Sequence, residues 1–175
     1  MKLILAALLL LLTACAGLPF TDEARAREIM EGVGQFYRTD AVIGSGEDEV
    51  RVRIYRPDPS QTRVEVLYPQ RVAGLVYTFR EEGVRLEMHG LVFNMDSYAG
   101  GSALPIPQAV GALAALLLPT AERGLPTEQD GLWVLRGQFG GQEYMLFLDE
   151  NGRPVKLLPG GSQPQIVLTD FVFLG

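Results

Sequence analysis

Few residues of this chain could carry acid–base, nucleophilic or metal chemistry. The sequence contains one histidine, His89, and one cysteine, Cys15. A hydrolytic site needs a nucleophile, a base and a group that orients the base, and a zinc site needs several Cys or His ligands. His89 follows Glu87 in a strand pattern and by alternation lies on the charged face, where a histidine needs no special role. We therefore expect no enzyme activity, no metal site and no cofactor.

Other polar clusters are explained by turns. Asp149-Glu150-Asn151 could suggest calcium, but the ligand spacing of a calcium loop is missing, and a hairpin turn accounts for these residues. Neither Gly100-Gly101 nor Gly140-Gly141 lies in a phosphate-binding signature. The chain has 15 Lys and Arg against 21 Asp and Glu, a formal charge of −6, and no basic run. Nucleic acid is therefore not an expected partner.

The Cys15 thiol follows an apolar segment at the start of the chain. Lys2 supplies a positive charge, residues 3–12 are all apolar, and Thr13-Ala14 precedes the cysteine. This order is typical of an export signal, and its apolar run is about half the length that a bilayer-spanning helix needs. A sole cysteine cannot form an intrachain disulfide, so the exported domain must be stabilised by packing.

The four residues Leu12-Thr13-Ala14-Cys15 resemble the lipobox of bacterial lipoproteins. The resemblance implies that Cys15 receives a lipid, that the signal is cut before it, and that the lipid anchors the chain to a membrane. It predicts a signal peptide over 1–14, a tether over 15–20 and a single domain over 21–175. The expected location is the bacterial cell envelope, on the outer side of the cytoplasmic membrane or in the outer membrane. An ordinary secretory signal that ends near a cysteine is the alternative.

The stretch from Arg63 to Asp96 contains three successive strand patterns, over 63–69, 75–80 and 84–96. Apolar and polar side chains alternate in each, which places the apolar ones on one face of an antiparallel sheet. Glu81-Glu82-Gly83 is a tight joint between two of them. Further strand patterns lie at 40–46, 49–56, 132–139, 142–148, 154–158 and 165–174.

Two helices are predicted beside these strands. An amphipathic helix runs from Thr21 to about Arg38, and a second, charge-free helix runs from Pro107 to Leu118. A helix that is apolar nearly all round is either a core helix or a movable lid over an apolar cavity, and both alternatives fit. The elements predict a mainly β fold with helices (α+β), a curved antiparallel sheet or half-open β-barrel with helices packed on its concave face.

The order of these elements and several short segments resemble the LolA/LolB superfamily, the periplasmic lipoprotein carrier and its outer-membrane receptor. The segments are RVEVLYP at 63–69, leading to GLVY at 74–77, and YMLFLD at 144–149, followed by Asn151-Gly152 and Pro154. The resemblance implies a half-open β-barrel whose concave face holds lipid acyl chains. The resemblance does not match the carrier's functional arginine or the receptor's membrane-inserting leucine residue by residue, so neither role is carried over.

Alternation assigns a set of side chains to the concave face, and three leucines of the charge-free helix are placed to meet them. These are Val52, Ile54, Val66, Tyr68, Tyr77, Phe79, Leu86, Met88, Leu113, Leu116 and Leu117. We expect them to bind a lipid or a lipoprotein acyl chain, in a membrane-anchored protein that sorts lipoproteins or transfers lipid. The alternative is an interaction protein that regulates or stabilises an envelope enzyme or signalling partner through its sheet surface. The same apolar residues line a filled core and an empty cavity, so both functions remain open.

The lipobox resemblance generates a direct test on Cys15. Cys15→Ser is expected to abolish incorporation of a radiolabelled fatty acid into the chain, because the acceptor thiol is removed. Thr13→Ser, which keeps the cysteine, is the control and should incorporate label as the parent does. Unchanged labelling of Cys15→Ser in the same host would contradict the predicted anchor.

Overall fold

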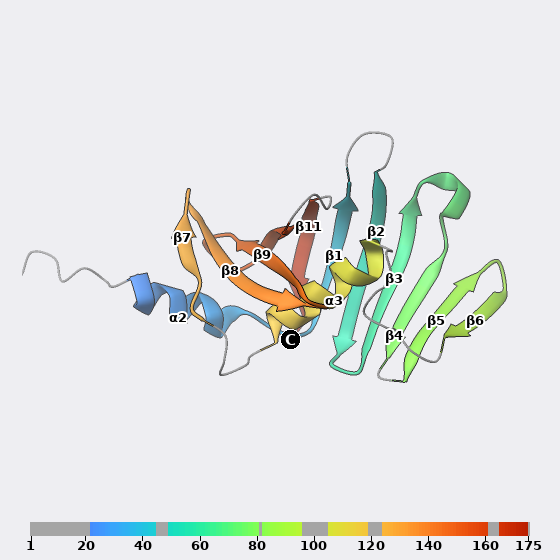
Figure 1. The fold of residues 1–175 in the computed structure, drawn as a ribbon, viewed down its shortest axis with the longest axis horizontal. Helices are drawn as coiled ribbons and strands as arrows, with labels where there is room; N and C mark the ends of the chain where they lie inside the picture. Colours follow the sequence, from blue (N-terminus) through green and yellow to red (C-terminus); the bar gives the residue numbers. More distant parts are fainter. Residues whose placement is uncertain are drawn as a thin grey trace, which may run out of the picture.

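The computed structural model describes residues 22–44, 49–80, 82–95, 105–118, 124–160 and 165–174. Cys15, the predicted signal peptide and the predicted tether lie outside these residues. Within them, the fold consists of two α-helices, a short 3-10 helix and eleven strands (Figure 1). The helices are α2 (Asp22–Gly32), η2 (Gln70–Val72) and α3 (Pro105–Leu117).

The strands form a single antiparallel sheet in the described part of the chain. They are β1 (Tyr37–Ile43), β2 (Val50–Asp58), β3 (Gln61–Tyr68), β4 (Val76–Arg80), β5 (Gly83–Met88), β6 (Leu91–Met95), β7 (Thr127–Gln129), β8 (Leu132–Phe139), β9 (Gln142–Leu148), β10 (Pro154–Pro159) and β11 (Ile166–Phe173). Their order is β6-β5-β4-β3-β2-β1-β11-β10-β9-β8-β7. Pairing of β1 with β11 therefore joins two meanders, and β6 and β7 are the two edges.

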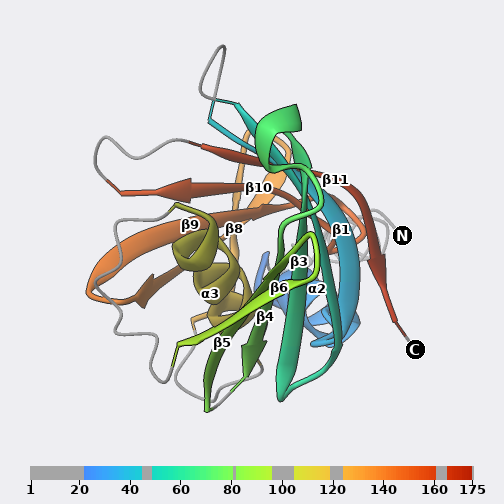
Figure 2. The same ribbon diagram turned by 90° about the vertical axis from the view of Figure 1, so that its right-hand side faces the viewer.

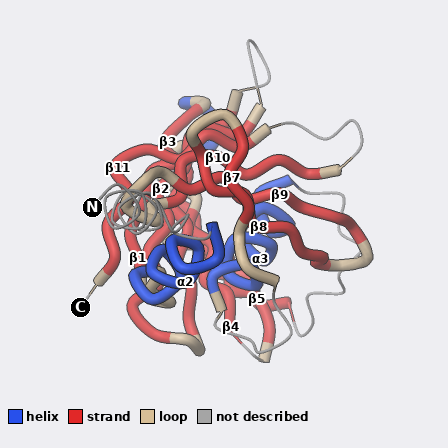
Figure 3. Tube along the Cα trace, turned by 90° about the vertical axis from the view of Figure 1, so that its left-hand side faces the viewer, coloured by secondary structure: helices blue, strands red, loops and turns tan. Residues whose placement is uncertain are grey.

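The sheet curves around its apolar face and does not close. Seen from the β6 side, α3 lies in the hollow between β4 and β5 on one side and β8 and β9 on the other (Figure 2). Seen from the β7 side, both α2 and α3 lie within the curve of the strands (Figure 3). The predicted fold class, a half-open barrel with helices on its concave side, is confirmed.

The first helix is shorter than predicted. It ends at Gly32, and Tyr37 and Arg38, which were expected to continue it, begin β1. Gly34 lies where any side chain would press on the Phe173 ring, since an added Cβ would be 3.1 Å from its Cδ1. Tyr37 stacks on Phe171 of β11, with ring centroids 5.2 Å apart. A contact across 134 residues of sequence therefore overrides a local helical pattern.

The predicted third strand pattern is two strands. His89 and Gly90 both have positive φ, 49° and 82°, and turn the chain back after Met88 so that β6 pairs with β5. Two residues with positive φ are typical of the hairpin turn that matches the twist of its strands. His89 is therefore an exposed turn residue, not the strand residue that alternation predicted. The short strand β7 was also missed, because its three residues, Thr127 to Gln129, are polar and exposed.

Two glycines let α3 approach β8 closely. A Cβ on Gly111 would lie 2.2 Å from Cζ of Phe139, and a Cβ on Gly137 would lie 2.6 Å from Cδ2 of Leu116. Each glycine therefore receives a large side chain from the facing element. The helix has no charged residue, and most of its side chains are buried. The structure thus holds α3 as a core helix against β8.

This fit predicts that Gly111→Ala destabilises the fold although alanine favours helix. Overpacking costs about 1–3 kcal/mol, whereas exchanging Gly for Ala inside a helix gains about 1 kcal/mol. We expect a net loss of about 1 kcal/mol in the free energy of unfolding, measured by chemical denaturation. Gly32→Ala, where nothing lies within 4 Å of the added Cβ, is the control and should not destabilise. Equal stability of Gly111→Ala and the parent would contradict the close approach.

Candidate functional site

The concave face presents most of the side chains that the sequence assigned to it. Val52, Ile54, Val66 and Tyr77 are buried, and Phe79 and Leu86 pack against them in the same apolar cluster. Direct cross-strand pairs fix this face, because paired residues lie on the same side of a sheet. Ile54 pairs with Val64, Val64 with Tyr77, and Tyr77 with Leu86. Met88 follows on the same side and is half-buried.

Tyr68 is the exception, and its predicted inward orientation is wrong. It is 46% exposed and lies opposite Arg51, whose guanidinium carbon is 5.8 Å from the centre of the Tyr68 ring. The register of β2 and β3 slips between Arg51 and Val52, so that Val52 pairs with Val66 and Leu67 is the extra residue. A bulge of this kind reverses the alternation beyond it and places Tyr68 on the outer face with Arg51.

The three leucines of α3 meet the strand residues as predicted. Leu113, Leu116 and Leu117 are buried in one cluster with Val52, Ile54 and the other inward side chains. Leu116 inserts over Gly137 of β8, which places the helix on the β8–β9 side of the hollow. In this part of the concave face the apolar side chains form a filled core.

The opposite side of the concave face, on β5 and β6, is open. Met88 pairs with Leu91, and Leu86 pairs with Phe93, so these four side chains share the concave side. Leu91 is 63% exposed and Phe93 is 60% exposed. We call this set of four residues the open patch. Sequence reasoning missed Leu91 and Phe93, because 84–96 was interpreted as one strand; the His89-Gly90 step was the signal that could have revealed the turn.

A polar cluster interrupts the apolar face at one end of β1, β2 and β3. Arg56 pairs with Tyr37 across the strands and is only 8% exposed. Its guanidinium donates hydrogen bonds to Thr62 Oγ1 at 2.8 Å and to the Pro59 carbonyl at 3.0 Å. The buried Tyr37 hydroxyl has no hydrogen-bond partner in the described part of the chain. Burial raises the pKa of the Tyr37 phenol, and the nearby charge of Arg56 opposes that shift to a lesser degree.

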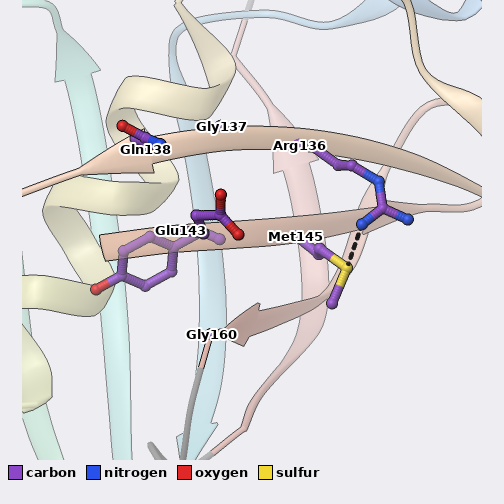
Figure 4. A pocket seen from close by; sticks show the side chains of 7 residues that line it. Arg136, Gly137, Gln138, Glu143, Met145 and Gly160 are labelled. Carbon is purple, nitrogen blue, oxygen red and sulfur yellow. Dashed lines mark hydrogen bonds between the residues drawn. The ribbon is translucent and has the colours of Figure 1, made fainter. Parts of the chain in front are cut away.

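The outer face carries a different kind of depression, on β8 and β9. It has a volume of about 290 Å³ and is lined by Arg136, Gly137, Gln138, Glu143, Tyr144, Met145 and Gly160 (Figure 4). Arg136 Nη1 lies 3.2 Å from Met145 Sδ. The lining combines the charged and amide groups of Arg136, Gln138 and Glu143 with the apolar surface of Tyr144 and Met145, so the depression suits a partner that has polar groups.

The described residues contain no group of three or more His, Cys, Asp or Glu that could hold a metal ion. Asp149 accepts backbone N–H groups of Asn151 at 2.9 Å and Arg153 at 2.8 Å, as a turn residue does. No helix in the same ranges has the length and apolar character needed to cross a bilayer. The concave face can therefore bind apolar groups, and the depression on the outer face can bind polar groups.

The comparisons with known proteins concern the fold. An uncharacterized conserved protein from Thermus thermophilus is similar over 86% of this chain and 88% of its own, with 18% identity and a TM-score of 0.51. A LolA superfamily protein from Nitrosomonas europaea matches over 86% and 94%, with 13% identity and a TM-score of 0.44. The lipoprotein LppX from Mycobacterium tuberculosis matches over 85% and 93%, with 11% identity and a TM-score of 0.39.

No protein-family model and no curated protein sequence matches the chain. The Thermus protein has the same fold at low identity, which assigns no activity. The structures described as a LolA superfamily protein and as a lipoprotein cover most of this chain, but their TM-scores are below 0.5.

The unpaired Tyr37 hydroxyl generates a stability prediction. Tyr37→Phe should raise the free energy of unfolding by about 1 kcal/mol at neutral pH, because it removes a buried donor without a partner. Because the folded pKa lies above the unfolded value of about 10, the parent loses stability as the pH rises above about 10, and Tyr37→Phe should lose less. Thermal melting across that pH range measures both effects. A variant that is less stable than the parent and has the same pH slope would contradict this account.

Proposed function

We propose that this chain is a membrane-anchored lipoprotein of the bacterial cell envelope that binds and transfers an apolar ligand. The ligand is a lipid or the acyl chain of another lipoprotein, and it lies on the concave face of the half-open barrel. One observation carries the proposal: the open patch exposes Leu91 and Phe93 on the same face that α3 covers elsewhere.

The open patch continues the apolar core without a polar border. Leu86 pairs with Tyr77, which is buried in the cluster that also holds Leu113. An apolar chain that lies on the patch therefore reaches the buried lining directly. Contiguous exposed apolar surface is typical of sites that bind ligands, partners or membranes.

The energetics suit reversible binding. An acyl chain that buries about ten methylenes would gain roughly 8 kcal/mol from removing them from water, before the costs of association and ordering are subtracted. Binding is then moderate in affinity, as a transfer step requires. The proposed anchor at Cys15 would keep this site near the membrane from which a ligand arrives or to which it goes.

The depression on β8 and β9 favours a second function, that of an interaction protein. It places Arg136 and Glu143 on the outer face, where the polar side chains of an envelope protein could dock. In that function the concave face serves only as a core. A substitution on the concave face should impair the ligand-binding function, whereas a substitution on the outer face should impair the interaction function.

A charge on the open patch tests the ligand site with little risk to the fold. Phe93→Glu should weaken binding of a neutral fluorescent alkyl probe by about tenfold or more, because an acyl chain would have to lie against a carboxylate. Phe79→Glu, deeper on the same face, should weaken it further if the variant stays folded. Tyr55→Glu places the same change on the outer face, where Tyr55 is 42% exposed, and should bind as the parent does.

Equal binding by Phe93→Glu and Tyr55→Glu would contradict a ligand site on the concave face. If the parent does not bind the probe, the lipid function is wrong and the interaction function takes its place. Circular dichroism of each variant provides the check on folding.

A further inference from the structure

The buried polar cluster of β1, β2 and β3 places the charged side chain of Arg56 and the unpaired hydroxyl of Tyr37 beside the apolar core. Arg56 brings a charge to the inner side of the sheet, and its two hydrogen-bond acceptors, Thr62 Oγ1 and the Pro59 carbonyl, are both neutral. No carboxylate of the described residues lies within ion-pair distance of Arg56. The carboxylate of Asp58 accepts hydrogen bonds from Ser60, which lower its pKa most, and the charge of Arg56 lowers that pKa to a lesser degree. A buried charge without a counter-charge is costly.

Tyr37 adds a second unused donor at the same place. Its ring is fixed by stacking on Phe171, and its hydroxyl is fully buried without a partner among the described residues. The phenol stays protonated well beyond neutral pH, since burial raises its pKa. Arg56 has five N–H groups, of which two are used in the bonds given above. The guanidinium and the phenol together therefore offer several donors and a positive charge, and no carboxylate of the described residues lies within ion-pair distance of Arg56.

The surroundings of this cluster are apolar and aromatic. Phe171 packs edge-on against Phe173, with ring centroids 5.1 Å apart, next to Tyr37. On the other side Thr62 pairs with Phe79, and Phe79 packs on the core that leads to β5. A molecule that satisfied Arg56 and Tyr37 would therefore have an acidic group at one end and an apolar chain along the concave face.

We propose that Arg56 and Tyr37 bind the anionic head group, a carboxylate or a phosphate, of an amphiphile whose apolar chain lies along the concave face toward the open patch. The inference rests on the proposed function and specifies its ligand class. A charge-assisted pair between guanidinium and an oxyanion, with the Tyr37 hydroxyl as a further donor, would give Arg56 an anionic partner at ion-pair distance, which the described residues do not provide. The apolar chain supplies affinity, and the head group sets the direction in which the chain lies.

The experiment compares ligands that differ only at the head group. Palmitate, hexadecyl phosphate and methyl palmitate are each used to displace a neutral fluorescent alkyl probe from the parent chain at mildly alkaline pH. We expect the two anions to bind at least about tenfold more tightly than the ester. Arg56→Met, which keeps the volume of the side chain, should bind the ester as the parent does and lose the preference for anions. Arg63→Met, on the exposed side of β3, is the matched control and should keep it.

The outcomes separate the two proposals. If palmitate and hexadecyl phosphate bind the parent no more tightly than methyl palmitate does, the proposed head-group site is wrong and the proposed apolar site on the concave face is retained. If none of the three displaces the probe, or the probe does not bind, the proposed function fails and this inference fails with it. If acetate or inorganic phosphate binds as tightly as the long-chain anions and depends on Arg56, the site serves a free anion, which overturns the amphiphile. Should Arg56→Met not fold, Tyr37→Phe must lower the preference of the parent for anions by at least about twofold.

Discussion

Burial of one apolar sheet face is the constraint on which the fold depends. An antiparallel sheet with one solvated side must cover its other side, and eleven strands that do not close into a barrel cannot do so alone. The charge-free helix α3 covers the β8–β9 part by fitting Gly111 and Gly137 against Phe139 and Leu116. The same fit keeps the helix on that side. The β5–β6 part of the face is consequently left exposed at Leu91 and Phe93.

Sequence periodicity predicted the parts of this face that regular pairing controls. Val52 and Ile54 were assigned correctly because nothing disturbs the alternation of β2 over those residues. Tyr68 was not, because one extra residue in β3 reverses the face and no local pattern reveals a bulge. Tyr37 was placed in a helix because its spacing from Val33 is helical, whereas its partner Phe171 is distant in sequence. Leu91 and Phe93 of the open patch were missed because the strand pattern of 84–96 was read through His89-Gly90, although both residues have positive φ and histidine is among the non-glycine residues enriched there.

Arg56 was missed for a related reason. It follows Ile54 on the inward side of β2, but arginine is normally exposed, and the sequence interpretation ended the strand there because prolines follow. Its burial without an ion pair in the described chain lowers stability, as does the unpaired hydroxyl of Tyr37. Most buried polar groups of native proteins have partners, so Arg56 without an ion pair and Tyr37 without a hydrogen bond are unusual among the described residues. An all-apolar version of the same face would not bear this cost in stability.

The two edges of the sheet are unlike, and the difference affects how copies of the chain meet in solution. β7 is three exposed polar residues long, a form that discourages strand addition. β6, the other edge of the sheet among the described residues, carries Leu91, Val92 and Phe93 exposed, a form that favours growth by further strands. The acidic charge of the chain, −6 over its full sequence, keeps copies apart at low ionic strength. Salt weakens that repulsion, so the colloidal stability of the free protein depends on the ionic strength around it.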